Sequence, residues 1–223
     1  MDQQHIKPAD IERTSMSIIE TELKERGICL PPELAPVVKR VIHTTADFDY
    51  ADNLRFTERA VELGIEAMKA APTIVTDTNM ARSGVSKPTL QKLGGQVLCY
   101  MAEPEVAELA KRNGTTRAVA SMDKALQEFE HPILAVGNAP TALLRLTELM
   151  EAGARPALVI GVPVGFVNVV ESKERIFAAC EKYSVPAIVA MGRKGGSNVA
   201  AAICNALLYS AANTLDPTAR GWQ

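Results

Sequence analysis

The chain lacks an excess of charge of either sign. Its 223 residues include 24 Lys and Arg against 26 Asp and Glu, which gives a net charge of −2. Binding to nucleic acid or to anionic membranes through bulk electrostatics needs a basic excess, so this balance argues against both partners. With 47% hydrophobic and 22% charged residues, the chain still has ample apolar surface for a core and does not resemble a disordered protein.

Cysteine is scarce and scattered. The four cysteines form no Cys-x-x-Cys pair and have no nearby histidine that would complete a zinc set; they are Cys29, Cys99, Cys180 and Cys204. Zinc sites and disulfide scaffolds both need ligands at characteristic spacings. We therefore expect reduced, mostly buried thiols and no metal site.

Long hydrophobic runs are also missing. The most apolar stretch, residues 156–170, is broken by Gly161, Pro163 and Gly165, so it falls short of the ~20 apolar residues that span a bilayer. The first residues, MDQQHIKPADIER, are polar and acidic, whereas a signal peptide has a basic start followed by an apolar run. These features predict no membrane span and a cytoplasmic location.

The first 70 residues have mainly helical patterns. Apolar residues recur at helical spacing from Pro8 until Gly27, which supplies a stop. A second helix is predicted from Pro32 to His43, with Pro31 or Pro32 near its first turn. A third is predicted from about residue 53 to 68. No linker interrupts the chain, so we expect a single domain over residues 1–223.

After residue 70 the pattern changes to short apolar runs, each ending in a turn and followed by a helical segment. The five runs span residues 73–77, 96–101, 133–137, 157–161 and 187–191. Such alternation predicts βαβ units and a largely parallel sheet covered on both faces, hence an α/β fold class. The βα units occupy residues 71–212, and residues 213–223 form a C-terminal tail.

In sheets of this kind the ligand lies outside the carboxyl ends of the strands, where helix N-termini and exposed amides gather. The loop 192–197 ends a strand and opens an Ala-rich helix over residues 198–211. Its glycines permit close backbone approach, Ser197 is a candidate N-cap, and Arg193 and Lys194 add positive charge. The loop has neither the P-loop order nor a dinucleotide fingerprint, and both an anion site and a merely structural turn fit it.

Two other loops carry signals of the same kind. In residues 137–141, Pro140 suits a first helical turn and Asn138 can present its amide outward, although a helix start without a ligand fits equally well. In residues 161–166, Phe166 at a loop tip suits a flat apolar ligand, and the alternative is a Phe166 that faces the core.

His43 is the strongest single candidate for catalysis. It ends an apolar helix, and Arg40 lies on the same helical face, where it could hold a carboxylate beside the imidazole. The alternative is a histidine that serves only as a cation at the helix C-terminus. His5 lies in the polar N-terminal segment and His131 precedes a strand, and neither has a metal-ligand partner.

Four ordered motifs together resemble the precorrin-8X methylmutase family, including its cobalt-precorrin-8 form. They are Gly137-Asn-Ala-Pro-Thr-Ala-Leu, the apolar run from residue 156 to 167, Glu171-Ser-Lys-Glu, and Gly192-Arg-Lys-Gly-Gly-Ser. The resemblance extends over nearly the whole chain, from Glu12 to Asn205.

The resemblance implies an isomerase of corrin and cobalamin biosynthesis that moves a methyl group from C-11 to C-12 of precorrin-8 or cobalt-precorrin-8, giving hydrogenobyrinate or cobyrinate. It also implies a three-layer α/β/α fold, a homodimer and a tetrapyrrole substrate. The family's catalytic histidine matches His43, as proton donor or acceptor. Its substrate-contacting arginine matches Arg40, and its serine matches Ser15 or Ser17. A methyl shift of this kind needs no cofactor or catalytic metal.

A precorrin is a flat apolar macrocycle fringed with carboxylates, so it needs an apolar cleft rimmed by basic residues and helix N-termini. Loop position adds further candidate substrate-binding residues: Thr44, Asp77, Asn79, Arg117, Asn138, Thr141, Gly165, Lys173, Arg193, Gly195, Gly196 and Ser197. Two alternatives remain at this point. One is a corrinoid carrier without catalysis, and the other is a Rossmann-like enzyme that binds a nucleotide at residues 192–197.

Overall fold

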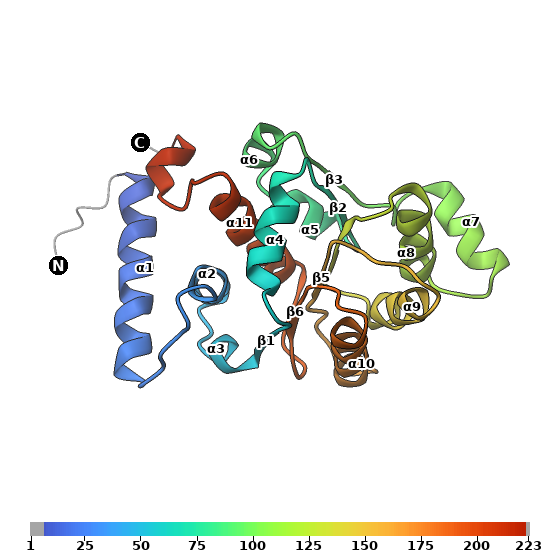
Figure 1. Ribbon diagram of the computed structural model, residues 1–223, viewed down its shortest axis with the longest axis horizontal. Helices are drawn as coiled ribbons and strands as arrows, with labels where there is room; N and C mark the ends of the chain where they lie inside the picture. Colours follow the sequence, from blue (N-terminus) through green and yellow to red (C-terminus); the bar gives the residue numbers. More distant parts are fainter. Residues whose placement is uncertain (1–6, 222–223) are drawn as a thin grey trace.

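The structure is a computed structural model that describes residues 7–221 (Figure 1). His5, and the part of the signal-peptide argument that rests on residues 1–6, lie outside the described residues. The centre of the fold is a six-stranded sheet in the order β1-β6-β5-β4-β2-β3. The strands are β1 (Leu54–Phe56), β2 (Thr73–Thr76), β3 (Gln96–Leu98), β4 (Ile133–Val136), β5 (Leu158–Gly161) and β6 (Ala187–Ala190).

All strand pairs are parallel except β1 with β6. The five predicted strands and the largely parallel sheet are therefore confirmed. The inner strands β4, β5 and β6 are buried along their whole length, which is why they have continuous apolar sequences rather than an alternating pattern.

Helices cover both faces of the sheet, as the α/β/α prediction requires. In Figure 1 one layer lies to the right of the sheet: α7 (Pro104–Arg112), α8 (Arg117–Glu128), α9 (Pro140–Glu151) and α10 (Val169–Lys182). The other face packs against α4 (Ala60–Lys69), α5 (Asn79–Gly84), α6 (Lys87–Lys92) and α11 (Ser197–Ala211), with α2 (Ala35–Thr45), α1 (Pro8–Glu25) and the short α3 (Tyr50–Asn53) outside them. A 3-10 helix, η1 (Pro217–Arg220), follows α11.

The predicted helix over residues 53–68 is wrong in its first part. Residues 54–56 form β1, and Leu54 pairs with Ala190 at the edge of the sheet. Thr57 fixes this edge, since its hydroxyl accepts a hydrogen bond from the Ala187 amide at 2.8 Å. Arg59 then takes a left-handed conformation with φ 55°, which interrupts any continuous helix, so α4 begins only at residue 60.

The start of α2 also differs from the prediction. Pro31 and Pro32 lie in a turn before the helix, and the Pro31 carbonyl accepts hydrogen bonds from the Leu34 and Ala35 amides. The helix begins at Ala35, so the proline of its first turn is Pro36. The stop at Gly27 is confirmed, because Gly27 follows the end of α1 with a positive φ of 71°.

The helix α11 is apolar almost all round and supports the helices outside it. It packs against α2, α4 and α5, and its small side chains allow close approach. A Cβ at Gly84 of α5, for example, would lie 2.7 Å from the Ala201 Cβ. The helix α2 lies on α11, and its residues Val37, Val41 and Ile42 are buried in the same core cluster as the residues of α11. The helix α1 lies outside α2 (Figure 1). This arrangement sets the position of the candidate site.

Cys180 and Cys204 are buried, Cys29 is exposed, and all four cysteines are free. Within residues 7–221, no group of three or more His, Cys, Asp and Glu side chains is arranged to hold a metal ion. None of the helices in this part of the chain has the length and apolar character that a membrane span requires.

Candidate functional site

His43 and Ser15 meet across the contact between α2 and α1. The Ser15 Oγ lies 2.8 Å from the His43 Nδ1, a hydrogen-bond distance. Both residues line an open groove of about 400 Å³ between the two helices, and most of its other walls are apolar, with Ile18, Ile42 and Phe48 among them. The hydrogen bond occupies one ring nitrogen and leaves Nε2 as the atom that can act on a ligand.

The surroundings of His43 keep its imidazole neutral. Burial lowers the pKa of His43 below its usual 6.5, and the positive charge of Arg40 lowers it further, while the carboxylate of Glu12 acts in the opposite direction. A neutral ring is a poor partner for the negative end of a helix, so the interpretation of His43 as only a helix-end cation is not favoured.

Arg40 belongs to a buried ion-pair network. Its Nη2 donates to the Glu12 Oε1 at 2.7 Å, and the Arg220 Nη2 donates to the same oxygen at 2.6 Å. Both guanidinium groups lie over the ring of Tyr209, at 5.3 Å and 4.2 Å from its centroid. The carboxylate that Arg40 holds near the imidazole thus comes from this chain. It belongs to Glu12, three residues before Ser15 on α1.

The structure separates the two candidate serines. Ser17 is exposed, and it lies about 200° around α1 from Ser15 because each residue of a helix turns by about 100°. Its backbone carbonyl accepts a hydrogen bond from the Thr21 hydroxyl, and Ser17 does not line the groove. Thr44 is exposed beside His43, and its hydroxyl donates to the Arg40 carbonyl.

The loops after β2 and β4 are joined by Asp77. This buried carboxylate accepts hydrogen bonds from the backbone amides of Gly137, Asn138 and Ala139 at 2.7–2.8 Å. Asp77 therefore fixes the N-terminal approach to α9 and has no exposed surface for a ligand. The side chain of Asn138 is exposed, as predicted from the loop.

Further candidates lie at helix N-termini along the same edge of the sheet. Asn79 is the first residue of α5 and Arg117 the first residue of α8, and both are exposed. The Thr141 hydroxyl, in the first turn of α9, lies 3.1 Å from that of Thr116, the N-cap of α8. The N-termini of α8 and α9 are thus adjacent.

The loop between β6 and α11 is packed from both sides. A Cβ at Gly195 would lie only 2.1 Å from the Val162 carbonyl oxygen, and the Gly196 amide donates to that oxygen at 2.8 Å. The close contact accounts for Gly195, and a positive φ of 136° accounts for Gly196, in both cases without a ligand. Ser197 is not the N-cap that the sequence suggested, because Gly196 takes that position; the Ser197 hydroxyl instead lies 2.7 Å from that of Thr78.

Phe166 does not face the core. Its side chain is 82% exposed at the tip of the loop after β5, and the guanidinium of the exposed Arg193 lies 5.5 Å from its ring centroid. The Gly165 amide donates to the Arg193 carbonyl at 3.3 Å. The loops after β5 and β6 therefore form one unit with an apolar and a positively charged surface.

Lys194 connects these loops with the groove at His43. Its Nζ donates to the Asp47 Oδ2 at 2.6 Å and to the Asp49 Oδ2 at 2.5 Å. Asp47 lies just past the C-terminus of α2, four residues after His43. The structure thus links the groove to one end of the row of sheet-edge loops.

Sequence reasoning missed several members of this arrangement. Glu12 carries a weak signal, because it lies one helical turn before Ser15 on the side of α1 that buries Ile19 and Leu23. Arg220 has no signal at all, since it reaches Glu12 from 208 positions away in the sequence. The pairing of Lys194 with Asp47 is equally non-local.

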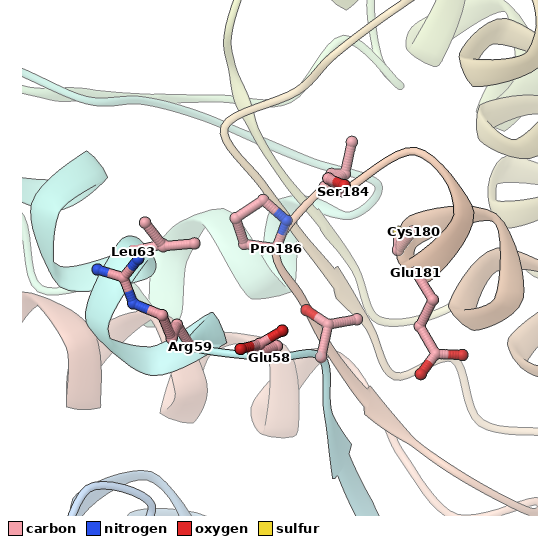
Figure 2. Close-up of a pocket in the computed structure, with 9 residues that line it drawn as sticks. Glu58, Arg59, Leu63, Cys180, Glu181, Ser184 and Pro186 are labelled. Carbon is pink, nitrogen blue, oxygen red and sulfur yellow. The ribbon is translucent and has the colours of Figure 1, made fainter.

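A separate cavity of about 380 Å³ lies at the opposite, amino-terminal edge of the sheet (Figure 2). Pro186, just before β6, and Arg59 and Leu63, at the start of α4, form one side of it, and Glu181 of α10 lies on the other. None of the candidate residues lines it, so it is not part of the site described above.

Comparison with known proteins gives a consistent result. A family model described as precorrin-8X methylmutase matches residues 10–210. The chain is 45% identical to the cobalt-precorrin-8 methylmutase of Salmonella typhimurium over 91% of this chain and 95% of that relative. It is 39% identical to the precorrin-8X methylmutase of Pseudomonas aeruginosa, over 88% and 93%.

A solved structure of precorrin-8X methylmutase from Thermus thermophilus superposes with a TM-score of 0.83. Its sequence is 42% identical to this one, and the alignment covers 92% of this chain and 96% of that structure.

Proposed function

The chain belongs to the precorrin-8X methylmutase family, and we propose that it moves a methyl group from C-11 to C-12 of a corrin precursor with His43 as the proton donor or acceptor. The observation that carries this proposal is the hydrogen bond between Ser15 and His43 in an open, largely apolar groove. The enzyme is an isomerase of cobalamin biosynthesis, and we place it in the cytoplasm as a single domain.

In this mechanism Ser15 fixes the imidazole and leaves Nε2 to face the substrate. The free enzyme holds His43 neutral, because burial and Arg40 lower the pKa of the ring. A substrate fringed with carboxylates brings negative charge to the groove, which raises the pKa of His43 and favours its protonated form. The imidazolium then protonates the conjugated ring, the methyl group migrates from C-11 to C-12, and the proton returns to His43.

We propose that exposed groups at the sheet edge bind the carboxylates of the macrocycle. Arg117 and Arg193 supply charge, and Asn79 and Asn138 supply amide groups. The exposed ring of Phe166 supports the same proposal, because a flat apolar face suits a macrocycle. Asp77, Gly195 and Gly196, which bind or pack against backbone, hold these loops in place.

We also propose that the enzyme is a homodimer. Ile11 and Ile18 of the outermost helix, α1, are 51% and 59% exposed beside the groove, and apolar side chains of this size suit an interface. Light scattering coupled to gel filtration should give twice the mass of one chain. A mass of one chain at micromolar concentration would contradict the dimer.

The reaction is tested by incubating metal-free precorrin-8 and cobalt-precorrin-8 separately with the wild-type protein and recording visible absorption spectra. We expect a shift to the corrin spectrum, and the substrate that reacts faster identifies the physiological one. His43→Asn should lower the rate by ~10²–10⁴, the usual contribution of a general acid.

Two other outcomes would overturn the proposal. Tight retention of the coloured ligand without any spectral change would favour a carrier. A lack of retention, combined with protection of residues 192–197 by a nucleotide, would favour a nucleotide-binding enzyme.

A further inference from the structure

Lys173 of α10 is a fully buried lysine without an acidic partner. Its side chain has 0% relative exposure, and no ion pair among residues 7–221 includes it. Lysine is almost never fully buried unless its charge is paired, so the burial of Lys173 needs a structural explanation. Burial lowers the pKa of Lys173 to about 8, and the amine therefore still carries a proton for most of the time at pH 7.

The amine of Lys173 binds two backbone carbonyls. Its Nζ donates to the Gly192 carbonyl and to the Lys194 carbonyl, each at 2.8 Å. These carbonyls lie two residues apart in the loop between β6 and α11, so one amine bridges the loop from inside the fold.

The same loop holds the end of the helix that carries His43. The Lys194 backbone is fixed by Lys173, and its side chain binds Asp47 and Asp49 just after α2. A backbone hydrogen bond, from the Met191 amide to the Asn53 carbonyl at 2.8 Å, also joins the end of β6 to the segment after α2.

We propose that Lys173 is a positioning residue, which fixes the loop 192–196 from within and, through Lys194, holds the C-terminal end of α2 so that His43 faces the substrate. The catalytic part of this inference rests on the proposed function. The anchoring part rests on geometry alone, and the two are tested separately.

Lys173→Met keeps an unbranched side chain only one atom shorter and removes its charge and donors. Lys182→Met is the matched control, because it makes the same change at an exposed position of the same helix. Limited digestion with trypsin reports on the anchor, since the carbonyl of the Lys194–Gly195 peptide bond is itself an acceptor of Lys173.

Proteolysis follows local opening of the chain, so we expect trypsin to cut after Arg193 and Lys194 about tenfold faster in Lys173→Met than in the wild type or the control. Cutting at the other lysines and arginines that all three proteins share should not change. Equal rates at these two bonds would overturn the anchor. If Lys173→Met does not fold, Lys173→Gln, which retains one neutral donor group, replaces it in the same comparison.

The connection to His43 is tested by a double-mutant cycle on kcat. We expect Lys173→Met and Lys194→Met each to lower kcat about tenfold with little change in KM, and the double variant to be no slower than the slower single variant, because both break one connection. Additive effects, or an unchanged kcat in Lys173→Met, would overturn the catalytic part. Absence of methylmutase activity in the wild type would refute the proposed function and leave the digestion result standing.

Discussion

Two glycines of the loop between β6 and α11 are required for different physical reasons, and alanine substitutions separate them. A Cβ at Gly195 would lie 2.1 Å from the Val162 carbonyl oxygen and 2.8 Å from that of Pro163. At Gly192 a Cβ would meet no atom within 4 Å, but φ is +74°. Gly195→Ala thus tests close packing, and Gly192→Ala tests backbone conformation.

The two costs differ in size. Nonbonded heavy atoms approach to about 3.5 Å at their optimum, so an alanine at 195 must displace backbone by more than 1 Å. Overpacking of this kind costs about 1–3 kcal/mol, and loss of the hydrogen bond from the Gly196 amide to Val162 adds about 1 kcal/mol. We expect Gly195→Ala to lower the free energy of unfolding by about 2–4 kcal/mol, and Gly192→Ala by about 1–2 kcal/mol.

Urea unfolding followed by circular dichroism gives both free energies, provided the slope with denaturant is unchanged. The activity of the folded variants adds a second comparison. Gly195→Ala displaces the segment that carries Lys194, so it should also lower kcat, whereas Gly192→Ala should affect it less. A Gly195→Ala variant within 0.5 kcal/mol of the wild type, or one less affected than Gly192→Ala, would refute the reasoning.

Three further predictions concern buried charges. Glu12→Gln leaves two buried guanidinium groups without a carboxylate and should lower the free energy of unfolding by about 3 kcal/mol, whereas Glu62→Gln, at an exposed ion pair, should change it little. Burial acts to raise the pKa of Glu12, but the two guanidinium groups bring it below 4.5. The contribution of Glu12 to stability is therefore present above pH 4.5 and lost as the pH falls further. If the difference in unfolding free energy between the wild type and Glu12→Gln, measured with urea, does not shrink below pH 4.5, this is contradicted. Arg40→Met removes a positive charge and should raise the pKa of His43 in an NMR titration. A lower pKa would contradict the claim that the charge of Arg40 lowers the pKa of His43. Asp77→Asn replaces a carboxylate that accepts three amides and should cost about 2–3 kcal/mol, with faster hydrogen exchange of those amides; unchanged exchange would refute it.

The fold was largely predictable because its signals are local. Each inner strand is buried on both faces, so its residues form an uninterrupted apolar run between turns. The edge strand β1 was missed for the opposite reason. It has three residues, Leu54–Phe56, and only its partner β6 gives it strand geometry.

Part of the candidate site was likewise predictable from the sequence, and part was not. The sequence indicated His43 and Ser15 through their resemblance to family motifs, and their side chains are within hydrogen-bond distance. Ser17 could not be separated from Ser15 by sequence, because alignment tolerates a slip of two residues, whereas a helix turns those two side chains to different sides.

The burial of two polar candidates was not predictable. Lys173 and Asp77 were predicted as ligand-binding residues from their positions in the motifs, and the structure shows that both are buried and bind backbone. Polar residues are mostly exposed, so sequence reasoning assigns them to a surface, and only the packed structure reveals which of them satisfy buried amides and carbonyls.

The sequence by itself therefore determined the five parallel strands with the helices that follow them, the histidine that we propose as catalytic, and the family. The tertiary structure alone decided the pairing of Glu12 with Arg220, of Lys194 with Asp47, and of Lys173 with the loop 192–196. Hydrophobic periodicity records which side of a segment is buried. It contains no information on which distant segment covers that side, because that depends on how all the layers pack together.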